Sequence, residues 1–485
     1  MERVALGRAA GLALAFVWLL AAETTAQPAP VHAPESDAGD TVITIGVMTR
    51  AELWRYFQPP PDALSDPAYV LYGARGRVGV RHREGRWRLA GGIQYVRVEP
   101  LPQLAIGPGA LGSGGLYQFH AQSTFSYQLY LRELALGVEV APGLEVMAGR
   151  LRIEDGGAAP ASAALADLRP RVEGRLLGSF SWALYERAFD GVRVDVSRPS
   201  WHLHAMAAQP TQGAYEMSAN LGLRGLEVAG VALTTRHGTR AETQAFAWGY
   251  RDRREVSGRP DNTGRVSRAA DVAIATVGAS HLARWSTRAG EMDVVLWGAA
   301  QAGRWYELDH LAWSATAEAG HRWPRAPWRP WVRAGVLVAS GDGDARDDRH
   351  GTFFPMLPSV ERQSASTVYA PMNLVDVFAR VAVSPHARVD AGVELHRVSL
   401  ASADDAWYTG GGATMRRGTY FGYSRRPSGG ATSLATVVEG TLDVRIAGPW
   451  SARVYAASIA GGDVVRRSFA GTRLRLLAVE TAIRF

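Results

Sequence analysis

The chain has 485 residues, no cysteine and a formal net charge of +7. Disulfides, thiolate metal sites and cysteine nucleophiles are therefore excluded, and the composition suits an oxidising compartment. All 53 basic residues are arginines, and this excess of positive charge indicates anionic partners. A mean hydropathy of −0.09 would suit a soluble domain, but it also suits strands whose apolar and polar faces cancel in the average.

Residues 1–26 have the layout of a secretory signal peptide. Arg3 and Arg8 precede the apolar stretch 12–22, and the small residues 24–26 offer a cleavage site before Gln27. The apolar run is shorter than the roughly 20 residues that a spanning helix needs. We expect a mature chain that begins near Gln27 with a short periplasmic segment over residues 27–40, and an exported membrane protein without spanning helices must cross as strands.

Apolar residues recur with period two along most of the chain. Ile43, Ile45 and Val47 alternate with smaller or polar residues, and the pattern returns over residues 74–81, 192–196, 332–338, 376–383, 388–396 and 438–446. At the end of the sequence, Leu477, Val479, Ile483 and Phe485 share one face of an extended strand. Such a terminal strand is typical of an outer-membrane barrel, which pairs its last strand with its first and exposes the apolar face to lipid.

The connections between these strands alternate in length. Short turns are expected near residues 84–85, 141–143, 198–200, 237–239, 384–386 and 447–449, and long loops near 100–121, 154–184, 252–270, 342–373 and 401–430. This alternation matches short periplasmic turns and long external loops. We therefore predict an all-β, transmembrane antiparallel β-barrel over residues 41–485. A direct count gives about nineteen strands, but the number should be even; reading residues 220–236 as one strand gives about eighteen, with sixteen as the alternative.

Arginines occupy lumen-facing positions of these predicted strands. The candidate pore-lining residues are Arg75, Arg77, Arg81, Arg86 and Arg88 on adjacent strands, and Arg150, Arg187, Arg193, Arg333, Arg380 and Arg388 elsewhere on the wall. Fixed guanidinium groups can replace the hydration of a carboxylate with bidentate contacts as it enters a narrow pore. Alternatively, they pair with Asp190, Asp195, Asp376, Asp390, Glu394 and Asp443 as a structural ladder, and both roles can hold at once.

One long loop combines acidic and aromatic residues. Its acids are Asp342, Asp344, Asp347 and Asp348, and the apolar residues that follow include Phe353 and Phe354. We expect this loop to fold back into the mouth as a gate, burying its apolar residues while its acids meet lumen arginines. Calcium is a second interpretation of the acids, although the spacing lacks the closing glutamate and Arg346 and Arg349 interrupt it. We expect no other cofactor, and the histidines show no metal-ligand spacing.

Three segments resemble the alginate export family of outer-membrane barrels. They are Arg-Ala-Phe-Asp-Gly-Val-Arg at 187–193, the acidic loop that runs into Thr-Phe-Phe-Pro at 340–358, and His396 with the Asp-Asp-Ala-Trp-Tyr stretch at 404–408. The likeness extends over residues of about 140–485. It implies an eighteen-stranded barrel through which an anionic polysaccharide or a smaller anionic solute passes along an arginine-lined pore, but it does not fix the substrate.

These observations together predict an outer-membrane channel for an anionic solute, above all a uronate-type polysaccharide or oligosaccharide. The alternatives are a general or small-anion porin, a structural barrel without transport, and an outer-membrane enzyme; no local arrangement of nucleophile and base supports the last. The expected partners are outer-membrane lipid and lipopolysaccharide, the barrel assembly machinery and the solute. Residues 27–40 are too few for a periplasmic scaffold, so that role would need a separate protein. Nucleic acid is not expected outside the cell.

Overall fold

The computed structural model describes residues 39–107 and 109–485. The predicted signal peptide and all but the last two residues of the predicted periplasmic segment lie outside the described residues. Within the described ranges, no helix combines the length and the apolar character that crossing a membrane requires.

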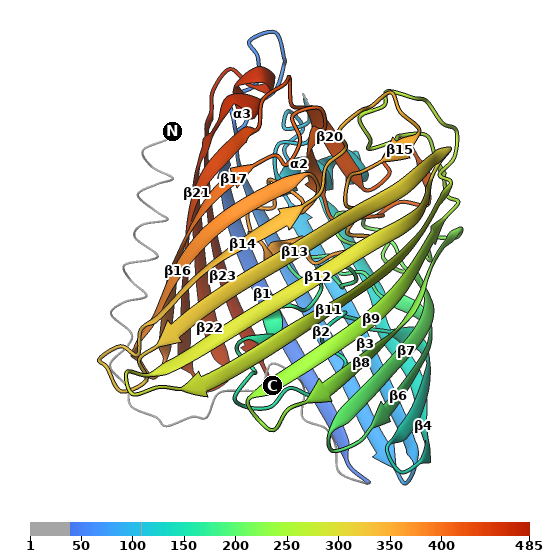
Figure 1. The fold of residues 1–485 in the computed structure, drawn as a ribbon, viewed down its shortest axis with the longest axis vertical. Helices are drawn as coiled ribbons and strands as arrows, with labels where there is room; N and C mark the ends of the chain where they lie inside the picture. Colours follow the sequence, from blue (N-terminus) through green and yellow to red (C-terminus); the bar gives the residue numbers. More distant parts are fainter. Residues whose placement is uncertain (1–38, 108) are drawn as a thin grey trace.

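Eighteen long antiparallel strands close into a barrel, which confirms the predicted fold class and strand number (Figure 1). Each strand pairs with its neighbours in the sequence, and β1 pairs with β23 from Gly46 opposite Arg484 to Arg55 opposite Arg475. The strands are β1 (Thr41–Arg55), β2 (Ala68–Glu84), β3 (Trp87–Glu99), β4 (Ser126–Ala141), β5 (Leu144–Leu151), β6 (Phe189–Ser197), β7 (Trp201–Pro210), β8 (Leu226–Arg236), β9 (Ala241–Asp252), β11 (Val272–Ser286), β12 (Glu291–Trp305), β13 (Leu308–Arg322), β14 (Trp331–Ala339), β16 (Leu374–His386), β17 (Val389–Ser399), β21 (Ser433–Ala447), β22 (Trp450–Gly461) and β23 (Arg473–Arg484).

The final residue extends the seam between the first and last strands. The Phe485 amide donates to the Ile45 carbonyl at 2.8 Å, and the Ile45 amide donates to the Phe485 carbonyl at 3.0 Å. Closure leaves no strand edge facing lipid, where an unpaired backbone group would be costly. The doubtful segment 220–236 holds one strand, as predicted, but β8 begins only at Leu226 and residues 220–225 belong to the preceding loop.

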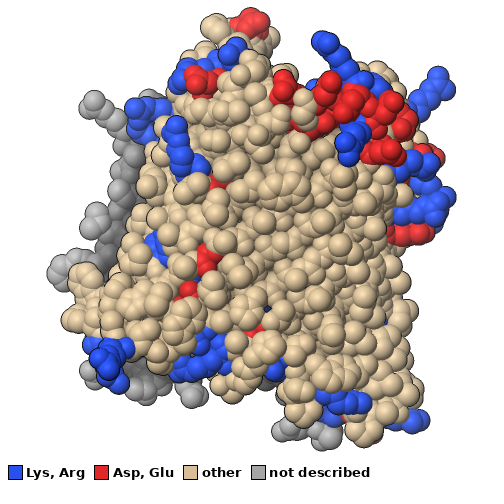
Figure 2. All heavy atoms as spheres, in the orientation of Figure 1, with Lys and Arg blue, Asp and Glu red and all other residues tan. Residues whose placement is uncertain are grey.

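The two faces of the barrel wall differ in polarity. Side chains with outward phase, such as those of Ile43, Val78, Val377 and Leu395, are apolar and exposed. Figure 2 shows the result on one side of the molecule, where a broad band with few charges separates charged residues at the two ends. The inward face carries arginines and carboxylates, so the period-two pattern of the sequence separates a lipid-facing surface from a charged lumen.

Most of the long loops gather at one end of the barrel (Figure 1), whereas the loop between β5 and β6 reaches the short-turn end, where Ser162 donates to the Thr239 carbonyl. The loops carry short elements of their own. These elements are α2 (Ser113–Ala121), η1 (Arg169–Arg171), β10 (Glu255–Val256), β15 (Arg349–His350), η2 (Val360–Arg362), β18 (Ala406–Gly410), β19 (Arg417–Gly418), β20 (Tyr423–Pro427) and α3 (Asp463–Ser468). Long loops are external in outer-membrane barrels and short turns are periplasmic. The β5–β6 loop (residues 152–188) and the β14–β16 loop (residues 340–373) bond to inward-facing residues of the wall.

A candidate solute path through the lumen

The β5–β6 loop crosses the lumen and attaches to the far wall. Asp167 forms ion pairs with Arg284 of β11 at 2.9 Å and with Arg322 of β13 at 2.5 Å. Arg171, at the end of η1, lies 3.0 Å from Glu318 of β13. Each contact joins a charged loop residue to an opposite charge on β11 or β13. These ion pairs hold the loop across the barrel.

The β14–β16 loop pairs with the β5–β6 loop inside the lumen. The Gly178 amide donates to the Leu357 carbonyl at 2.8 Å, and the Leu357 amide donates to the Leu176 carbonyl at 2.9 Å. The Ser359 amide adds a bond of 2.7 Å to the Gly174 carbonyl. The two loops therefore form one backbone-bonded unit, and a change in the position of one must involve the other.

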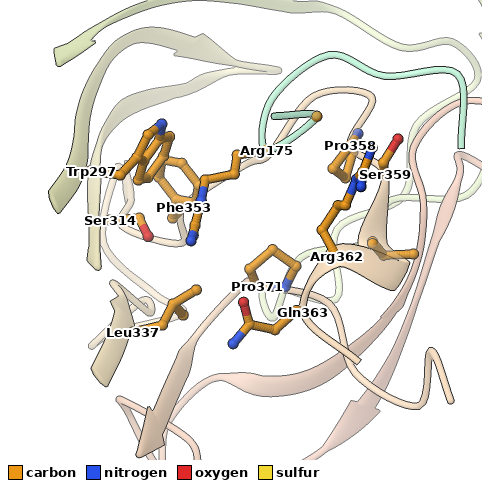
Figure 3. A pocket seen from close by; sticks show the side chains of 12 residues that line it. Arg175, Trp297, Ser314, Leu337, Phe353, Pro358, Ser359, Arg362, Gln363 and Pro371 are labelled. Atoms are coloured by element: carbon orange, nitrogen blue, oxygen red, sulfur yellow. The ribbon is translucent and has the colours of Figure 1, made fainter. Parts of the chain in front are cut away.

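A narrow cavity remains between this unit and the barrel wall. Its wall side is formed by Trp297, Ser314 and Leu337, and its loop side includes Arg175, Phe353 and Pro358. Figure 3 shows Arg175 and Phe353 beside the wall residue Trp297 at one side of this space, with Pro358, Ser359 and Arg362 at the other. The Arg175 guanidinium carbon lies 5.3 Å from the centre of a Trp297 ring. The narrow part of the lumen thus combines a cationic side chain with aromatic surface.

Two carboxyl groups are buried within the joined loops. Burial raises the pKa of Asp155 to about 7, although the amides of Leu176 and Leu177 donate hydrogen bonds to its carboxyl group. Burial also raises the pKa of Glu361 to about 7, and the Arg362 charge opposes this only in part. Both groups therefore titrate near neutral pH while the loops are docked.

An arginine cluster surrounds Glu186, just before β6. Arg77 lies 2.5 Å from the Glu186 carboxylate, Arg132 at 2.9 Å and Arg75 at 3.5 Å. Burial by itself would raise the pKa of Glu186, but these three guanidinium groups and that of Arg152 outweigh it and hold the pKa well below its usual range. Four guanidinium groups thus converge on one carboxylate, while Glu133, Glu154 and Glu480 act on some of them more weakly.

Five other predicted pore residues lie on the inward face and are paired with acids. Arg81 lies 3.6 Å from Glu133, and Arg380 lies 3.8 Å from Glu394. The remaining three form closer pairs: Arg88 with Glu139 and Glu145, Arg193 with Asp195, and Arg333 with Asp293 and Glu318. The ladder alternative is thus present in the structure, and the pairs Arg445–Asp390 and Arg453–Asp443 continue it.

Four predicted pore residues lie elsewhere. Arg150 faces outward, because it pairs in register with Leu134, whose side chain is exposed on the lipid-facing side, and its partner is Asp190 at 2.7 Å. Arg86 and Arg388 lie in the short turns after β2 and β16. Arg187 is buried among the external loops and donates to the Gly411 carbonyl. The period-two rule fails for these residues because it applies only within an uninterrupted strand of known phase.

The predicted gating loop is only partly as expected. Phe353 and Phe354 are fully buried, the former against Trp297 and the latter against Trp305 and Tyr250. The expectation that the acids meet lumen arginines is wrong. Asp344, Asp347 and Asp348 lie exposed on the external surface, where Asp348 approaches Arg265 at 3.9 Å. Asp342 is buried, and its amide donates to the Asp405 carboxylate at 2.9 Å. The charged tip stays in water because only the apolar part gains by burial.

Comparison with known proteins identifies the family. A model of the alginate export family matches residues 169–476. The chain belongs to the alginate export family. Among solved structures, it is similar to the outer membrane protein OpdK from Pseudomonas aeruginosa, with a TM-score of 0.53, 10% identity, and coverage of 92% of this chain and 99% of that chain. It is also similar to OccK2 (OpdF) from the same organism in complex with glucuronate, with a TM-score of 0.55, 8% identity, and coverage of 93% and 99%.

A third structure with this fold is OpdK with vanillate, with a TM-score of 0.53, 10% identity, and coverage of 91% of this chain and 98% of that chain. Identities this low show the fold alone. Comparison with curated proteins gives no significant match. Family and fold together place this member of the alginate export family in the outer membrane as a channel-type barrel.

Sequence reasoning missed three members of the cluster in this alginate export barrel. Glu186 directly precedes the family segment that begins at Arg187, so its position was a usable signal. The sequence did not identify Arg132 because the pairing of β3 with β4 shifts in register between Gly92 and Ile93. This shift changes which residues of β4 face the lumen. Arg152 lies just beyond the end of β5, where strand periodicity no longer assigns a face.

Proposed function

We propose that this outer-membrane channel passes carboxylate-bearing saccharides, of the uronate type, through a lumen whose arginines bind them in passing and whose infolded loops control access. The observation that carries the proposal is the cluster of Arg75, Arg77, Arg132 and Arg152 around the single carboxylate of Glu186. A second carboxylate, carried by a solute, could bind the guanidinium groups that converge here, first that of the partly exposed Arg77.

The degree of exposure supports a role in conduction. The side chains of Arg77 and Arg81 are 26% and 46% exposed, so a solute could reach them without displacing the wall. Conduction favours several moderate sites over one tight site, and Arg88 and Arg193, each paired with acids, continue the row of guanidinium groups toward the short turns. The similar barrel OccK2 (OpdF) was solved in complex with glucuronate, which is the chemical class proposed here.

Planar-bilayer conductance with the purified barrel tests the proposal. Uronate oligomers should block the current in a concentration-dependent way, while neutral oligosaccharides of the same length should not. Blocking should weaken between 0.1 M and 1 M salt, because the screening length falls from about 10 Å to about 3 Å. Equal block by charged and neutral oligomers would contradict the proposal.

A small-anion porin is the second candidate. The observation in its favour is that the joined loops leave only a narrow cavity beside the wall residues Trp297, Ser314 and Leu337, and such a space suits a small anion better than a polymer. Reversal potentials with acetate and with uronate monomers and oligomers as the main anion separate the two functions. A small-anion porin would conduct acetate and monomers well and would exclude the oligomers without being blocked by them.

A further inference from the structure

A histidine on the lumen wall lies between three carboxylates. His396 on β17 is almost completely buried, and its Nδ1 lies 2.9 Å from Asp376 of β16. Its Nε2 lies 3.7 Å from Glu394 on the same strand and 3.7 Å from Glu439 of β21. Both Nε2 and the facing oxygen Oε1 of Glu394 are buried without a hydrogen-bond partner. A buried nitrogen thus points between two carboxylates without bonding to either.

This arrangement has the features of a metal site. A metal-binding histidine usually donates its other ring N–H to a carboxylate, which fixes the tautomer and leaves the opposite nitrogen as the ligand. Asp376 occupies that position. Ligand atoms about 2.0–2.2 Å from a tetrahedral zinc ion lie about 3.3–3.6 Å from one another. The observed separations of 3.7 Å between Nε2 and each glutamate oxygen require only a small contraction.

The surrounding groups also hold the glutamates in place. The other oxygen of Glu439 accepts hydrogen bonds from Tyr455 at 2.6 Å and from Ser364 at 2.8 Å. Arg380 and Arg171 approach Glu394 at 3.8 and 3.7 Å, but Arg171 lies closer to Glu318, at 3.0 Å. The negative charge of Asp376, Glu394 and Glu439 therefore exceeds the positive charge of the nearby arginines. A divalent cation beside a neutral imidazole would balance this excess.

A doubly protonated imidazole is the competing explanation. Its Nε2–H would be expected to draw one carboxylate to the usual hydrogen-bond distance of about 2.7–3.2 Å. Equal separations from two oxygens beyond that range fit a shared central ion better. We propose that His396, Glu394 and Glu439 bind one divalent transition-metal ion of the zinc type, with Asp376 orienting the imidazole.

The site lies where the infolded loops meet the wall. Ser364 of the β14–β16 loop bonds Glu439, and Gln363 of the same loop donates to Asp376 at 2.7 Å. Arg171 brings the β5–β6 loop to Glu394. A bound ion would fix the side chains to which both loops attach, so metal binding would strengthen the docking of the loops.

Metal titration of the folded, tag-free barrel in detergent tests this inference without any solute. After treatment with a chelator, calorimetry with Zn²⁺ should show one ion per chain, and Co²⁺ should give the visible absorption of a low-symmetry nitrogen and oxygen site. His396→Gln and Glu439→Gln should each abolish this binding, and Asp376→Asn should weaken it by about 10–100-fold. The matched control is His204→Gln, because His204 is also a buried lumen histidine bonded to an aspartate, Asp195, at 2.9 Å.

Heat-modifiable mobility on gels first establishes that each variant is folded. Saturable one-to-one binding that is lost in the His396 variant and kept in the His204 variant supports the site. The absence of saturable binding by the folded wild-type barrel, or stoichiometric binding that persists in both His396→Gln and Glu439→Gln, would overturn it. Neither result depends on which solute the channel conducts, so the metal site and the proposed function fail independently.

Discussion

Removing two arginine charges from the lumen should weaken the binding of anionic solutes. The double variant Arg77→Gln, Arg81→Gln keeps a polar side chain at each position, and Arg75 and Arg132 remain as partners of Glu186. Both replaced side chains are partly exposed on β2, so the barrel should still fold. The change acts on the field that a passing carboxylate meets, because the two guanidinium groups lose their positive charge.

The size of the effect follows from Coulomb's law. Two unit charges 4 Å apart interact by about 1 kcal/mol in bulk water and by about 4 kcal/mol at an effective dielectric constant of 20. The lumen is partly hydrated, and each arginine shares its field with a glutamate, so we take about 1 kcal/mol for each. A loss of about 2 kcal/mol corresponds to roughly 30-fold weaker block by a uronate oligomer. At 1 M salt the difference should shrink, because charges are then screened within about 3 Å.

Block constants and reversal potentials in planar bilayers measure this effect at both salt concentrations. The matched control is the double variant Arg240→Gln, Arg288→Gln, which removes the same charge from exposed positions in the short turns after β8 and β11. The control should behave like the wild type. If the lumen variant also shows wild-type block and reversal potential at 0.1 M salt, Arg77 and Arg81 do not lie on the solute path.

Three further predictions concern assembly, pH and the loop gate. Phe485→Ala should reduce barrel insertion but not export, because it removes roughly 2 kcal/mol of lipid burial from the closing strand. Heat-modifiable mobility on gels measures the fraction of folded barrel, and Val266→Ala in an external loop is the control. Asp155 and Glu361 have pKa values near 7 in the docked loops, so their protonated forms favour docking. Docking should therefore weaken as the pH rises from about 4.5 through about 7. Conductance should increase over that interval, and it should increase less in Glu361→Gln. Constant conductance across this interval would contradict the assignment. Deleting residues 342–357 should raise conductance and reduce discrimination among anions. Deleting only the exposed tip, residues 344–348, should change neither property. Equal single-channel conductance in both deletions would show that the buried part of the loop does not narrow the pore.

The sequence alone determined the architecture, because the membrane imposes strict local rules. Alternation along strands such as 43–47 and 376–383, with turns and loops of alternating length, is what a closed barrel in lipid requires. The same rules require an even strand number, and reading residues 220–236 as one strand predicted eighteen, with sixteen as the alternative. Lumen phase was assigned correctly for Arg75, Arg77 and Arg81, because the strand that carries them is regular.

Only the tertiary structure decided how the lumen is used. Alternation along a strand predicts which face a side chain occupies but not which residue it contacts. The arginine cluster around Glu186 and the pairing of Arg333 with Asp293 and Glu318 could therefore not be derived from spacing. The shift in register at β4 and the strand ends near Arg150 and Arg187 broke the phase on which the assignment rested. Glu394 and His396 lie on β17, and Glu439 of the neighbouring strand β21 follows His396 by 43 positions in the sequence. Such clusters depend on which strands closure makes neighbours and on which loops fold inward, and these are properties of the whole barrel.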